Sequence, residues 1–261
     1  MADLKKYQVT TAKIIKMENL CGTIYDVTVE NEYLAQASRC GQFVHIDCGE
    51  EFVLRRPISI CEVTDTGIRF IFDVRGKGTK RLSEKQVGDS LDILGPLGNG
   101  FAVRKGKSLI LGGGIGVYPL YELAKQVSKE NPCDVALGFR NKDLVTLEDE
   151  FKTKCDNLFI ATDDGSYGFH GNALQAVKEK LESGAYETVY ACGPLPMLKA
   201  LKEITDKYNI FCQISMEERM GCGIGACLCC NIKVEDDGEE GFKHLHVCKD
   251  GPVFNAKEVL L

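Results

Sequence analysis

The sequence lacks any run of apolar residues long enough to cross a membrane, and its first ten residues, MADLKKYQVT, contain no hydrophobic signal core. It also lacks an excess of basic residues, because 32 Lys and Arg stand against 38 Asp and Glu, for a net charge of −6. Without that excess there is no electrostatic reason to expect nucleic acid as a partner. We therefore expect a cytoplasmic protein that binds neither membrane nor nucleic acid.

What the sequence does contain is an ordinary soluble composition and many cysteines. Its 261 residues are 44% hydrophobic and 27% charged, which suits two modest domains with a sizeable core. Thirteen cysteines must be explained in a compartment where disulfides rarely persist. Several stand singly in apolar stretches and suit small buried side chains: Cys48, Cys61, Cys133 and Cys212.

Four other cysteines crowd into the glycine-rich run MGCGIGACLCCN at residues 220–231. Three of them, Cys222, Cys227 and Cys230, have the spacing C-x4-C-x2-C, and Cys248 follows after seventeen further residues. This is the plant-type spacing of a [2Fe–2S] cluster. The sequence therefore predicts these four cysteines as iron ligands and leaves Cys229 as a spare thiol.

The glycines between the cysteines support a cluster loop. Such a loop wraps the cluster with backbone N–H groups directed at sulfur, so it needs positive φ angles and little bulk, which Gly223, Gly225 and Ala226 can supply. A zinc site usually has two Cys-x2-Cys pairs, whereas only one is present here. Cysteines that are merely buried or reactive would not need the interleaved glycines.

Histidines are few and scattered: His45, His170, His244 and His246. The last two lie near Cys248 and suggest mixed ligation, but the cysteines already supply four sulfurs. We interpret the histidines as structural or solvent-facing. With no general acid–base pair in the sequence, we expect no catalytic side chains in the usual sense.

The middle third alternates short apolar runs with helical periodicity. Strands are expected at 107–111, 134–139, 157–161 and 187–191, and helices at 117–127, 144–152, 171–183 and 196–208. Strands that alternate with helices are typical of a parallel sheet.

Two glycine turns follow strands of this expected sheet, GGGIG at 112–116 and CGP at 192–194. Backbone N–H groups and a helix N-terminus at such a turn suit a pyrophosphate. The first turn does not have the G-x-G-x-x-G spacing, so a purely structural turn is an open alternative, and Cys192 is alternatively a small buried residue. Two such turns at the carboxyl ends of one sheet indicate a ligand crevice.

The first hundred residues have a different pattern. Six short β-rich segments separated by turns, at 7–15, 24–29, 42–47, 57–63, 68–74 and 90–94, predict a small antiparallel barrel. Within it, LRRPISI at 54–60 places two arginines before a strand, where a guanidinium would suit a phosphate. FDVRGKGT at 72–79 ends another strand. Each segment alone is alternatively a solvated turn.

Together and in this order, these segments resemble the electron-transfer subunits of class 1B dihydroorotate dehydrogenases, within the ferredoxin reductase superfamily. The resemblance covers essentially the whole length. It rests on RRPISI (55–60), RGKGT (75–79), LGPLGNGF (94–101), GGGIGVYPL (112–120), ACGPLPM (191–197), and EERMGCGIGAC (217–227) with VCKDGPVF (247–254).

The resemblance implies an α+β multidomain chain: an FAD-binding antiparallel six-stranded β-barrel at 1–102, a nicotinamide-binding α/β parallel-sheet domain at 103–212, and a small [2Fe–2S] subdomain at 213–261. It implies that FAD contacts Arg56, Pro57, Ile58, Ser59, Phe72, Asp73, Val74, Gly78 and Thr79. It implies that NAD contacts Gly112, Gly113, Gly114, Ile115, Gly116, Cys192, Gly193 and Pro194. The wider superfamily has an aromatic residue at the position of Ile58, so flavin stacking cannot be assumed there.

The implied function is electron transfer in pyrimidine biosynthesis. NAD carries two electrons as hydride and an iron–sulfur cluster carries one, while FAD can exchange both ways. The implied partner is an FMN-containing subunit that oxidises dihydroorotate, in a heterotetramer of two plus two. The alternatives are an NAD(P)H diaphorase subunit of a sulfhydrogenase or flavin-based transhydrogenase and, from another class, a non-catalytic redox sensor or a zinc-stabilised binding module.

The choice between NAD and NADP is less direct. After the second expected strand, the segment GFRNK at 138–142 offers no acidic residue for a ribose 2′-OH, whereas Arg140 and Lys142 could hold a 2′-phosphate. The family resemblance favours NAD, which we expect, with NADP not excluded.

Overall fold

The structure is a computed structural model that describes residues 7–261. Residues 1–6 lie outside the described residues. The expectation that the chain has no signal segment rests largely on these residues. The chain forms two compact units. The barrel unit comprises the chain up to Gly100 with Glu217–Asn231 and His246–Pro252, and the sheet unit comprises Phe101–Met216, Ile232–Leu245 and Val253–Leu261. The three-domain boundaries given above stay a prediction.

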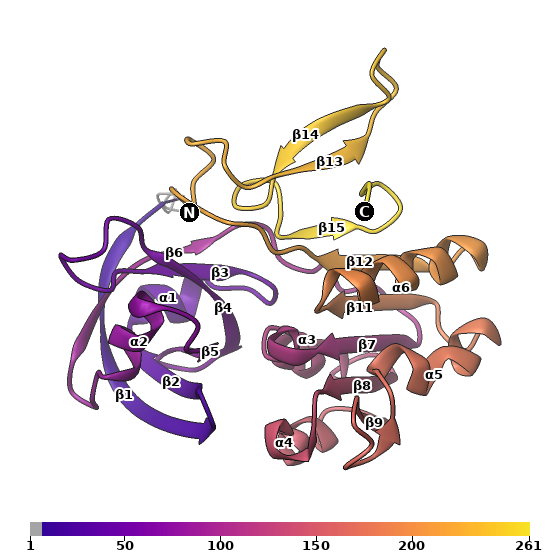
Figure 1. Ribbon diagram of the computed structural model, residues 1–261, viewed down its shortest axis with the longest axis horizontal. Coiled ribbons are helices and arrows are strands. Elements are labelled where there is room, and N and C mark those ends of the chain that lie inside the picture. The colour runs from indigo at the N-terminus through magenta and orange to yellow at the C-terminus, as the bar shows by residue number, and fades with distance from the viewer. Residues whose placement is uncertain (1–6) are drawn as a thin grey trace. The chain divides into compact units, whose positions relative to one another are not determined.

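The barrel unit contains a closed barrel of six antiparallel strands in the order β1-β2-β5-β4-β3-β6 (Figure 1). The strands are β1 (Val9–Cys21), β2 (Ile24–Glu30), β3 (Phe43–Ile46), β4 (Arg56–Val63), β5 (Gly67–Asp73) and β6 (Ser90–Leu97). Alternating residues fill its interior with Ile, Val, Leu and Phe side chains. The predicted six-stranded antiparallel barrel is confirmed. Two short helices that the sequence did not indicate lie in its loops, α1 (Glu32–Ala37) and α2 (Lys77–Ser83).

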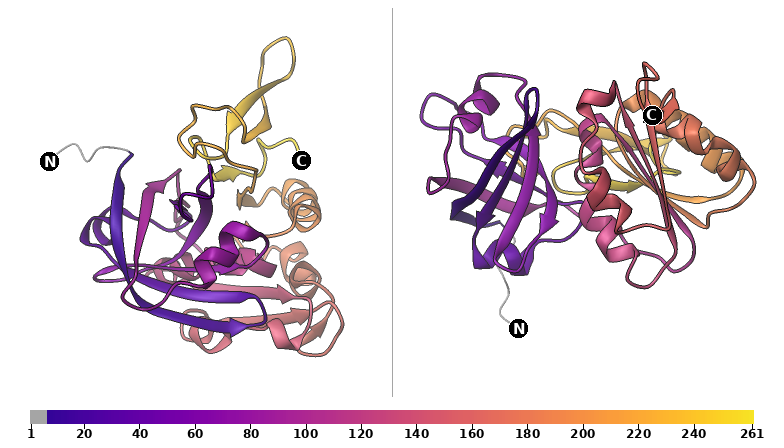
Figure 2. Two further views of the ribbon diagram at one scale, coloured as in Figure 1. Left: turned by 60° about the vertical axis from the view of Figure 1, so that its left-hand side comes forward. Right: turned by 90° about the horizontal axis from the view of Figure 1, so that it is seen from below.

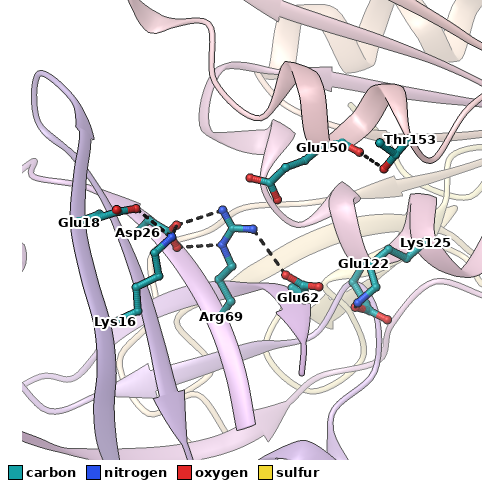
Figure 3. Close-up of polar contacts among 9 residues, drawn as sticks. All are labelled: Lys16, Glu18, Asp26, Glu62, Arg69, Glu122, Lys125, Glu150 and Thr153. Carbon is teal, nitrogen blue, oxygen red and sulfur yellow. Dashed lines mark hydrogen bonds and ion pairs between the residues drawn. The ribbon is translucent and has the colours of Figure 1, made fainter. Parts of the chain in front are cut away.

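A chain of charged side chains links four neighbouring strands of this barrel (Figure 3). Arg69 on β5 donates from Nε and Nη2 to the two carboxylate oxygens of buried Asp26 on β2, at 2.9 and 3.0 Å. Lys16 on β1 lies 3.1 Å from Asp26 and 2.8 Å from Glu18, and Glu62 on β4 lies 3.5 Å from Arg69. The bidentate Arg–Asp pair compensates the burial of Asp26 and fixes the pairing of β2 with β5.

The sheet unit contains a seven-stranded sheet in the order β10-β9-β8-β7-β11-β12-β15. Its strands are β7 (Ser108–Gly113), β8 (Cys133–Phe139), β9 (Asn157–Thr162), β10 (Phe169–His170), β11 (Thr188–Cys192), β12 (Phe211–Ser215) and β15 (Val253–Asn255). All neighbours pair in parallel except β15, which runs antiparallel to β12. The predicted parallel sheet is confirmed, and it has strands at both edges that the sequence did not indicate.

Helices cover both faces of this sheet. The helices α3 (Leu120–Val127) and α4 (Glu148–Lys152) lie on one face, and α5 (Ala173–Glu182) and α6 (Leu195–Lys207) lie on the other (Figures 1 and 2). Every residue of β7, β8 and β11 is buried. This two-sided burial explains why these strands read as continuous apolar runs in the sequence. None of the helices formed by residues 7–261 is long and apolar enough to cross a bilayer.

The prediction of one helix was wrong. The segment 144–152 is not a single helix: a 3₁₀ turn, η2 (Lys142–Leu144), ends before α4 (Glu148–Lys152) begins. Leu147 separates the two in a left-handed conformation, with φ of 57°. The β-branched Val145 and Thr146 just before it weaken helix formation, and three acidic residues in the first turn of α4 favour a fresh helix start.

The last 45 residues are divided between the two units. After the cluster loop, β13 (Asn231–Glu235) and β14 (Phe242–His246) form a two-stranded sheet, the chain returns to the barrel unit at His246–Pro252, and β15 then completes the seven-stranded sheet. The return to the barrel unit is held by Asn99, whose backbone N–H donates to the Gly251 carbonyl at 2.6 Å. The amide of Asn99 donates to the carbonyls of Lys249 and Asp250 at 3.2 and 2.9 Å.

Candidate functional site

The cluster loop, residues 217–231 of the barrel unit, wraps backbone N–H groups around one sulfur. Three of them donate to the Cys222 sulfur: those of Ile224 at 3.4 Å, Ala226 at 3.2 Å and Cys227 at 3.4 Å. Burial alone would raise the pKa of this thiol, but these donors outweigh it and lower the pKa from 9.0 to about 7. Cys222 is therefore held close to its thiolate form, which is the form that binds metal.

Glycine makes this wrapping possible. Gly223 and Gly225 have φ angles of 75° and 82°, in the left-handed region that side chains avoid. The third expected residue, Ala226, is not among the residues with positive φ, and Leu228, at 57°, is. Ala226 contributes its N–H group and its small size instead.

The distant cysteine comes back to this loop. The Gly225 N–H group donates to the Cys248 sulfur at 3.1 Å, and the Cys248 N–H group donates to the Cys230 sulfur at 3.4 Å. Burial, together with a hydrogen bond to Cys230, raises the pKa of the Cys248 thiol to about 12. The thiols of Cys222 and Cys227 also hydrogen-bond to each other. The structure thus brings Cys222, Cys227, Cys230 and Cys248 together, and their binding of iron stays a prediction.

The thiols differ in exposure. Cys230 and Cys248 are buried, whereas Cys227 and Cys229 are exposed. The hydrogen bonds just described do not involve Cys229. Within residues 7–261 no three His, Cys, Asp or Glu side chains converge on a single ion position. A [2Fe–2S] cluster divides four thiolates between two irons, so its ligands need not converge on one point.

The two neighbouring arginines of RRPISI have different surroundings. Arg55 forms an ion pair with Asp92 on β6 at 2.7 Å. Arg56, the first residue of β4, has no carboxylate partner among the described residues, and its guanidinium lies 5.5 Å from the centre of the Phe52 ring. A Cβ atom on Gly78 would come within 2.4 Å of Arg56 Nε, so Gly78 leaves room for the guanidinium. Arg56 Nη1 donates to the Leu54 carbonyl, and a half-buried guanidinium without a carboxylate partner is a strong phosphate ligand.

The remaining residues of β4 that we expected to contact FAD point in alternate directions. Ile58 packs against the barrel core, so its side chain replaces the superfamily's aromatic residue without lying on the outer face. Pro57 and Ser59, its neighbours, are half-buried and pair across the sheet with His45 and Phe43 on β3.

The turn after β5 is fixed by its own hydrogen bonds. Asp73 accepts from the Thr23 hydroxyl at 2.6 Å and from Arg75 Nε at 3.0 Å. Thr79 Oγ1 accepts from the N–H groups of Arg75 and Gly76 at 3.0 and 3.2 Å, which caps α2.

Two further residues of this segment belong largely to the barrel interior. The Phe72 side chain is 3% exposed and stacks on Tyr25, with ring centres 5.8 Å apart. Val74 packs against the same core. A ligand at Phe72 would therefore meet its backbone rather than its ring.

In the sheet unit the two glycine turns lie side by side. Cys192 at the end of β11 pairs with Gly112 near the end of β7. A Cβ on Gly116 would come within 2.5 Å of the Cys192 carbonyl oxygen, and one on Gly193 would come within 3.0 Å of the Gly113 nitrogen. The turns need glycine for this close backbone approach.

The other expected residues of these turns follow from the same arrangement. Gly114 and Ile115 begin the 3₁₀ turn η1 (Gly114–Val117), which leads into α3. The Pro194 ring lies against Gly113 and precedes α6. The Cys192 side chain is 2% exposed, as in the alternative of a small buried residue.

Acidic residues that sequence reasoning missed lie beside the expected 2′-phosphate cations. Because β9 pairs with β8, the backbone N–H of Asp163 donates to the Phe139 carbonyl at 3.0 Å and that of Asp164 to the Arg140 carbonyl at 3.3 Å. Hydrogen bonds from Ser166 lower the pKa of Asp164, so it is charged at neutral pH. The pairing of β8 with β9 thus places two further carboxylates at the end of the second strand, in addition to Asp143, which follows Lys142 in the sequence.

His45 is another residue whose importance the sequence did not reveal. It is 0% exposed, which agrees with the structural half of the interpretation that the histidines are structural or solvent-facing. Neither of its ring nitrogens has a hydrogen-bond partner within the described residues. Burial, with the charges of Arg55 and Arg56, lowers its pKa to about 4, which keeps the ring neutral. In the sequence only its place in an alternating strand, GQFVHI, sets it apart.

Two family models match the chain. Residues 217–260 match the iron–sulfur cluster binding domain of dihydroorotate dehydrogenase B, and residues 110–203 match the oxidoreductase NAD-binding domain. The first covers all four candidate cluster ligands, and the second covers both glycine turns.

Curated relatives extend this similarity over nearly the full length. The electron transfer subunit of dihydroorotate dehydrogenase B (NAD(+)) from Caldanaerobacter subterraneus subsp. tengcongensis is 43% identical over 250 residues, covering 95% of this chain and 97% of the relative. The subunit of the same name from Geobacillus thermodenitrificans is 43% identical over 257 residues, with the same coverage. That from Enterococcus faecalis is 40% identical over 258 residues.

Solved structures agree on the fold. An NADH-dependent reduced ferredoxin-NADP oxidoreductase is 30% identical, has a TM-score of 0.82, and is matched over 95% of this chain and 89% of its own. A ferredoxin NADP+ reductase from Neisseria gonorrhoeae with bound FAD and NADP is 15% identical, with a TM-score of 0.65 over 78% of this chain and 92% of its own. This chain belongs to the family of electron transfer subunits of dihydroorotate dehydrogenase B.

Proposed function

We propose that this chain passes electrons between the FMN of a dihydroorotate-oxidising partner subunit and NAD, by way of its own [2Fe–2S] cluster and FAD. The observation that carries the proposal is the meeting of three thiols of the cluster loop with Cys248, where backbone N–H groups donate to the sulfurs of Cys222, Cys230 and Cys248. As a member of its family, the chain is an oxidoreductase subunit that uses FAD, an iron–sulfur cluster and NAD.

We assign the cluster to Cys222, Cys227, Cys230 and Cys248. These residues fit the group because three N–H groups donate to the Cys222 sulfur and lower its pKa, while the N–H groups of Gly225 and Cys248 donate to the sulfurs of Cys248 and Cys230. When bound, the cluster supplies one-electron transfer. The chain's own contribution is to hold the thiolates, to bury Cys230 and Cys248, and to leave Cys227 near the surface.

We assign FAD to the outer end of the barrel, at Arg56, Pro57, Ile58, Ser59, Phe72, Asp73, Val74, Gly78 and Thr79. The guanidinium of Arg56 neutralises a phosphate there, with Gly78 giving it room. Asp73 and Thr79 shape the turn through their hydrogen bonds, and Ile58 and Phe72 support it from the core side.

We assign NAD to the adjoining turns that end β7 and β11, at Gly112, Gly113, Gly114, Ile115, Gly116, Cys192, Gly193 and Pro194. Backbone N–H groups of the first turn, at the start of η1 and α3, suit the pyrophosphate. Asp163 and Asp164 at the neighbouring strand end disfavour the additional phosphate of NADP near Arg140.

The partner that we propose is an FMN-containing subunit in a heterotetramer of two plus two, in the cytoplasm. Support comes from the relatives' name, electron transfer subunit, because such a subunit requires a catalytic partner. Leu228 in the cluster loop is 60% exposed and Val53 in the barrel unit is 99% exposed, apolar positions that suit a protein interface.

A second candidate is a diaphorase role in an electron-bifurcating transhydrogenase. It is favoured by the 30% identity and TM-score of 0.82 to the NADH-dependent reduced ferredoxin-NADP oxidoreductase. A protein of this type would serve a different catalytic partner with the same three cofactor sites.

The proposal is tested by purifying the chain alone and together with its natural partners. Alone, the chain should reduce an artificial dye with NADH but should not oxidise dihydroorotate, because that reaction needs a base beside the substrate carbon and a flavin to take the hydride, which we assign to the partner subunit. The partner that co-purifies should carry FMN and restore dihydroorotate-dependent reduction of NAD. Dihydroorotate oxidation by the lone chain, or a partner without FMN, would contradict it.

A further inference from the structure

His45 lies under the cluster loop, on the outer face of the barrel. Its neighbours on β3, Val44 and Ile46, both belong to the barrel core, so strand alternation turns His45 to the opposite face. An outward side chain on a barrel is usually solvated, yet His45 is 0% exposed. The residue that lies on its ring is Gly223: a Cβ there would come within 2.8 Å of His45 Nδ1.

This contact explains a second feature of Gly223. Its φ of 75° serves the wrapping of the loop around Cys222, and the absence of a side chain lets the loop descend onto the imidazole. His45 therefore lies against the residue that directly follows a candidate iron ligand. Across the sheet it pairs with Pro57, in the segment assigned to FAD.

The buried imidazole lacks the hydrogen bonds that its burial demands. A neutral histidine has one N–H donor and one acceptor nitrogen, and leaving such groups without hydrogen bonds in the interior destabilises the fold. Within residues 7–261 neither His45 Nδ1 nor Nε2 has a partner. The nearby cations, Arg55 and Arg56, cannot accept the ring N–H because guanidinium groups only donate.

We propose that the ring N–H of His45 donates a hydrogen bond to a sulfur of the [2Fe–2S] cluster and thereby raises its reduction potential. The inference rests on the cluster assignment made above. A donor to a cluster sulfur favours the reduced, more negative state, and hydrogen bonds to the sulfurs are a main determinant of cluster potentials. His45 is thus a positioning residue for electron transfer and not a catalytic residue.

The first test is a redox titration of the full chain with its cofactors bound, followed by EPR of the reduced cluster. His45→Leu removes the donor, so the cluster potential should become more negative while the FAD potential stays unchanged. His45→Gln keeps a neutral N–H donor and should leave the cluster potential nearer to that of the unaltered protein. His244→Leu is the matched control, because His244 is exposed on β14, and it should change neither potential.

The second test does not depend on the stability of His45→Leu. In protein labelled with ¹⁵N-histidine, pulsed EPR of the reduced cluster should show a weak histidine nitrogen coupling that is lost in His45→Gln and kept in His244→Leu. No coupling in the unaltered protein, or an unchanged cluster potential in a cluster-loaded His45→Leu variant, would overturn the proposal. A shift of the FAD potential alone would also overturn it, because the acceptor would then be the flavin.

The experiments distinguish an error about the His45 hydrogen bond from an error about the cluster ligands or the partner subunit. If the cluster ligands are wrong, Cys248→Ser retains the cluster whatever His45 does. If the dihydroorotate partner is wrong, the potential and the nitrogen coupling are unaffected, because both are measured on this chain.

Discussion

The two units of the molecule build their candidate sites in different ways. In the sheet unit, the glycine turns that meet follow β7 and β11, which are neighbours in a parallel sheet whose strand ends share one edge. In the barrel unit, the cluster loop at 217–231 and the segment around Cys248 are joined to a barrel that ends at Leu97. The first site follows from strand order, and the second requires contacts between segments far apart in the sequence.

This difference shows where each site is vulnerable. The sheet site depends on close backbone packing, so an added methyl group should damage it. The barrel unit's sites depend on side chains, Arg56 and four thiols, brought together by loops.

Loss of the cluster is the largest expected effect. Cys248→Ser should abolish the iron–sulfur absorption and EPR signal and lower the iron content, because it removes the one candidate ligand that comes from outside the loop. Cys229→Ser is the matched control and should leave all three measurements largely intact. Equal loss in both variants would mean that the assignment of ligands within the loop is wrong.

Gly116→Ala should damage the nucleotide site and the sheet together. The new Cβ would lie within 2.5 Å of the Cys192 carbonyl oxygen, and its three nearest atoms all belong to the backbone, which cannot move cheaply. We expect a higher KM for NADH in dye reduction and a loss of about 2 kcal/mol in unfolding free energy. Gly138→Ala is the graded comparison, since its nearest contact, at 3.0 Å, is less severe. Equal effects of the two would argue against close packing as the cause.

Gly78→Ala should weaken FAD binding by about tenfold with little change in stability, because displacing Arg56 costs one charged hydrogen bond to phosphate. The new Cβ meets the movable guanidinium of Arg56 at 2.4 Å rather than backbone. Gly76→Ala, in the same turn but with open space around its Cβ, is the control. The release of FAD is measured by flavin fluorescence during dilution. Equal FAD loss in both variants would contradict the proposal that Arg56 binds a phosphate of FAD.

The smallest effect concerns the choice of nicotinamide cofactor. The unaltered chain should prefer NADH to NADPH, and Asp164→Asn should narrow the preference severalfold by removing a negative charge beside Arg140. The preference is measured as the ratio of kcat/KM for NADH to kcat/KM for NADPH in steady-state kinetics. Asp149→Asn, at a fully exposed carboxylate in α4, is the control. A preference of the unaltered chain for NADPH would contradict the assignment.

The site in the sheet was easier to anticipate than its selectivity. GGGIG and CGP mark turns after apolar strands, and parallel strands necessarily end at one edge, so the meeting of Gly116 with Cys192 follows from the pattern. The sequence analysis did not identify Asp163 and Asp164, because they follow a different strand from the one that precedes Arg140. Only the pairing of β8 with β9 places them together.

The six-stranded barrel, the parallel sheet and the position of the cluster loop could be predicted from the sequence, because alternation, apolar runs and cysteine spacing are local properties of the chain. The folded chain was needed to show that Arg55 has an ion-pair partner, that Ile58 faces the core, and that the C-terminal segment is divided between the two units. It also decided that His45 is buried beneath Gly223. These features depend on contacts between residues distant in sequence, and burial and charge pairing are set by what the fold brings near, which no local pattern encodes.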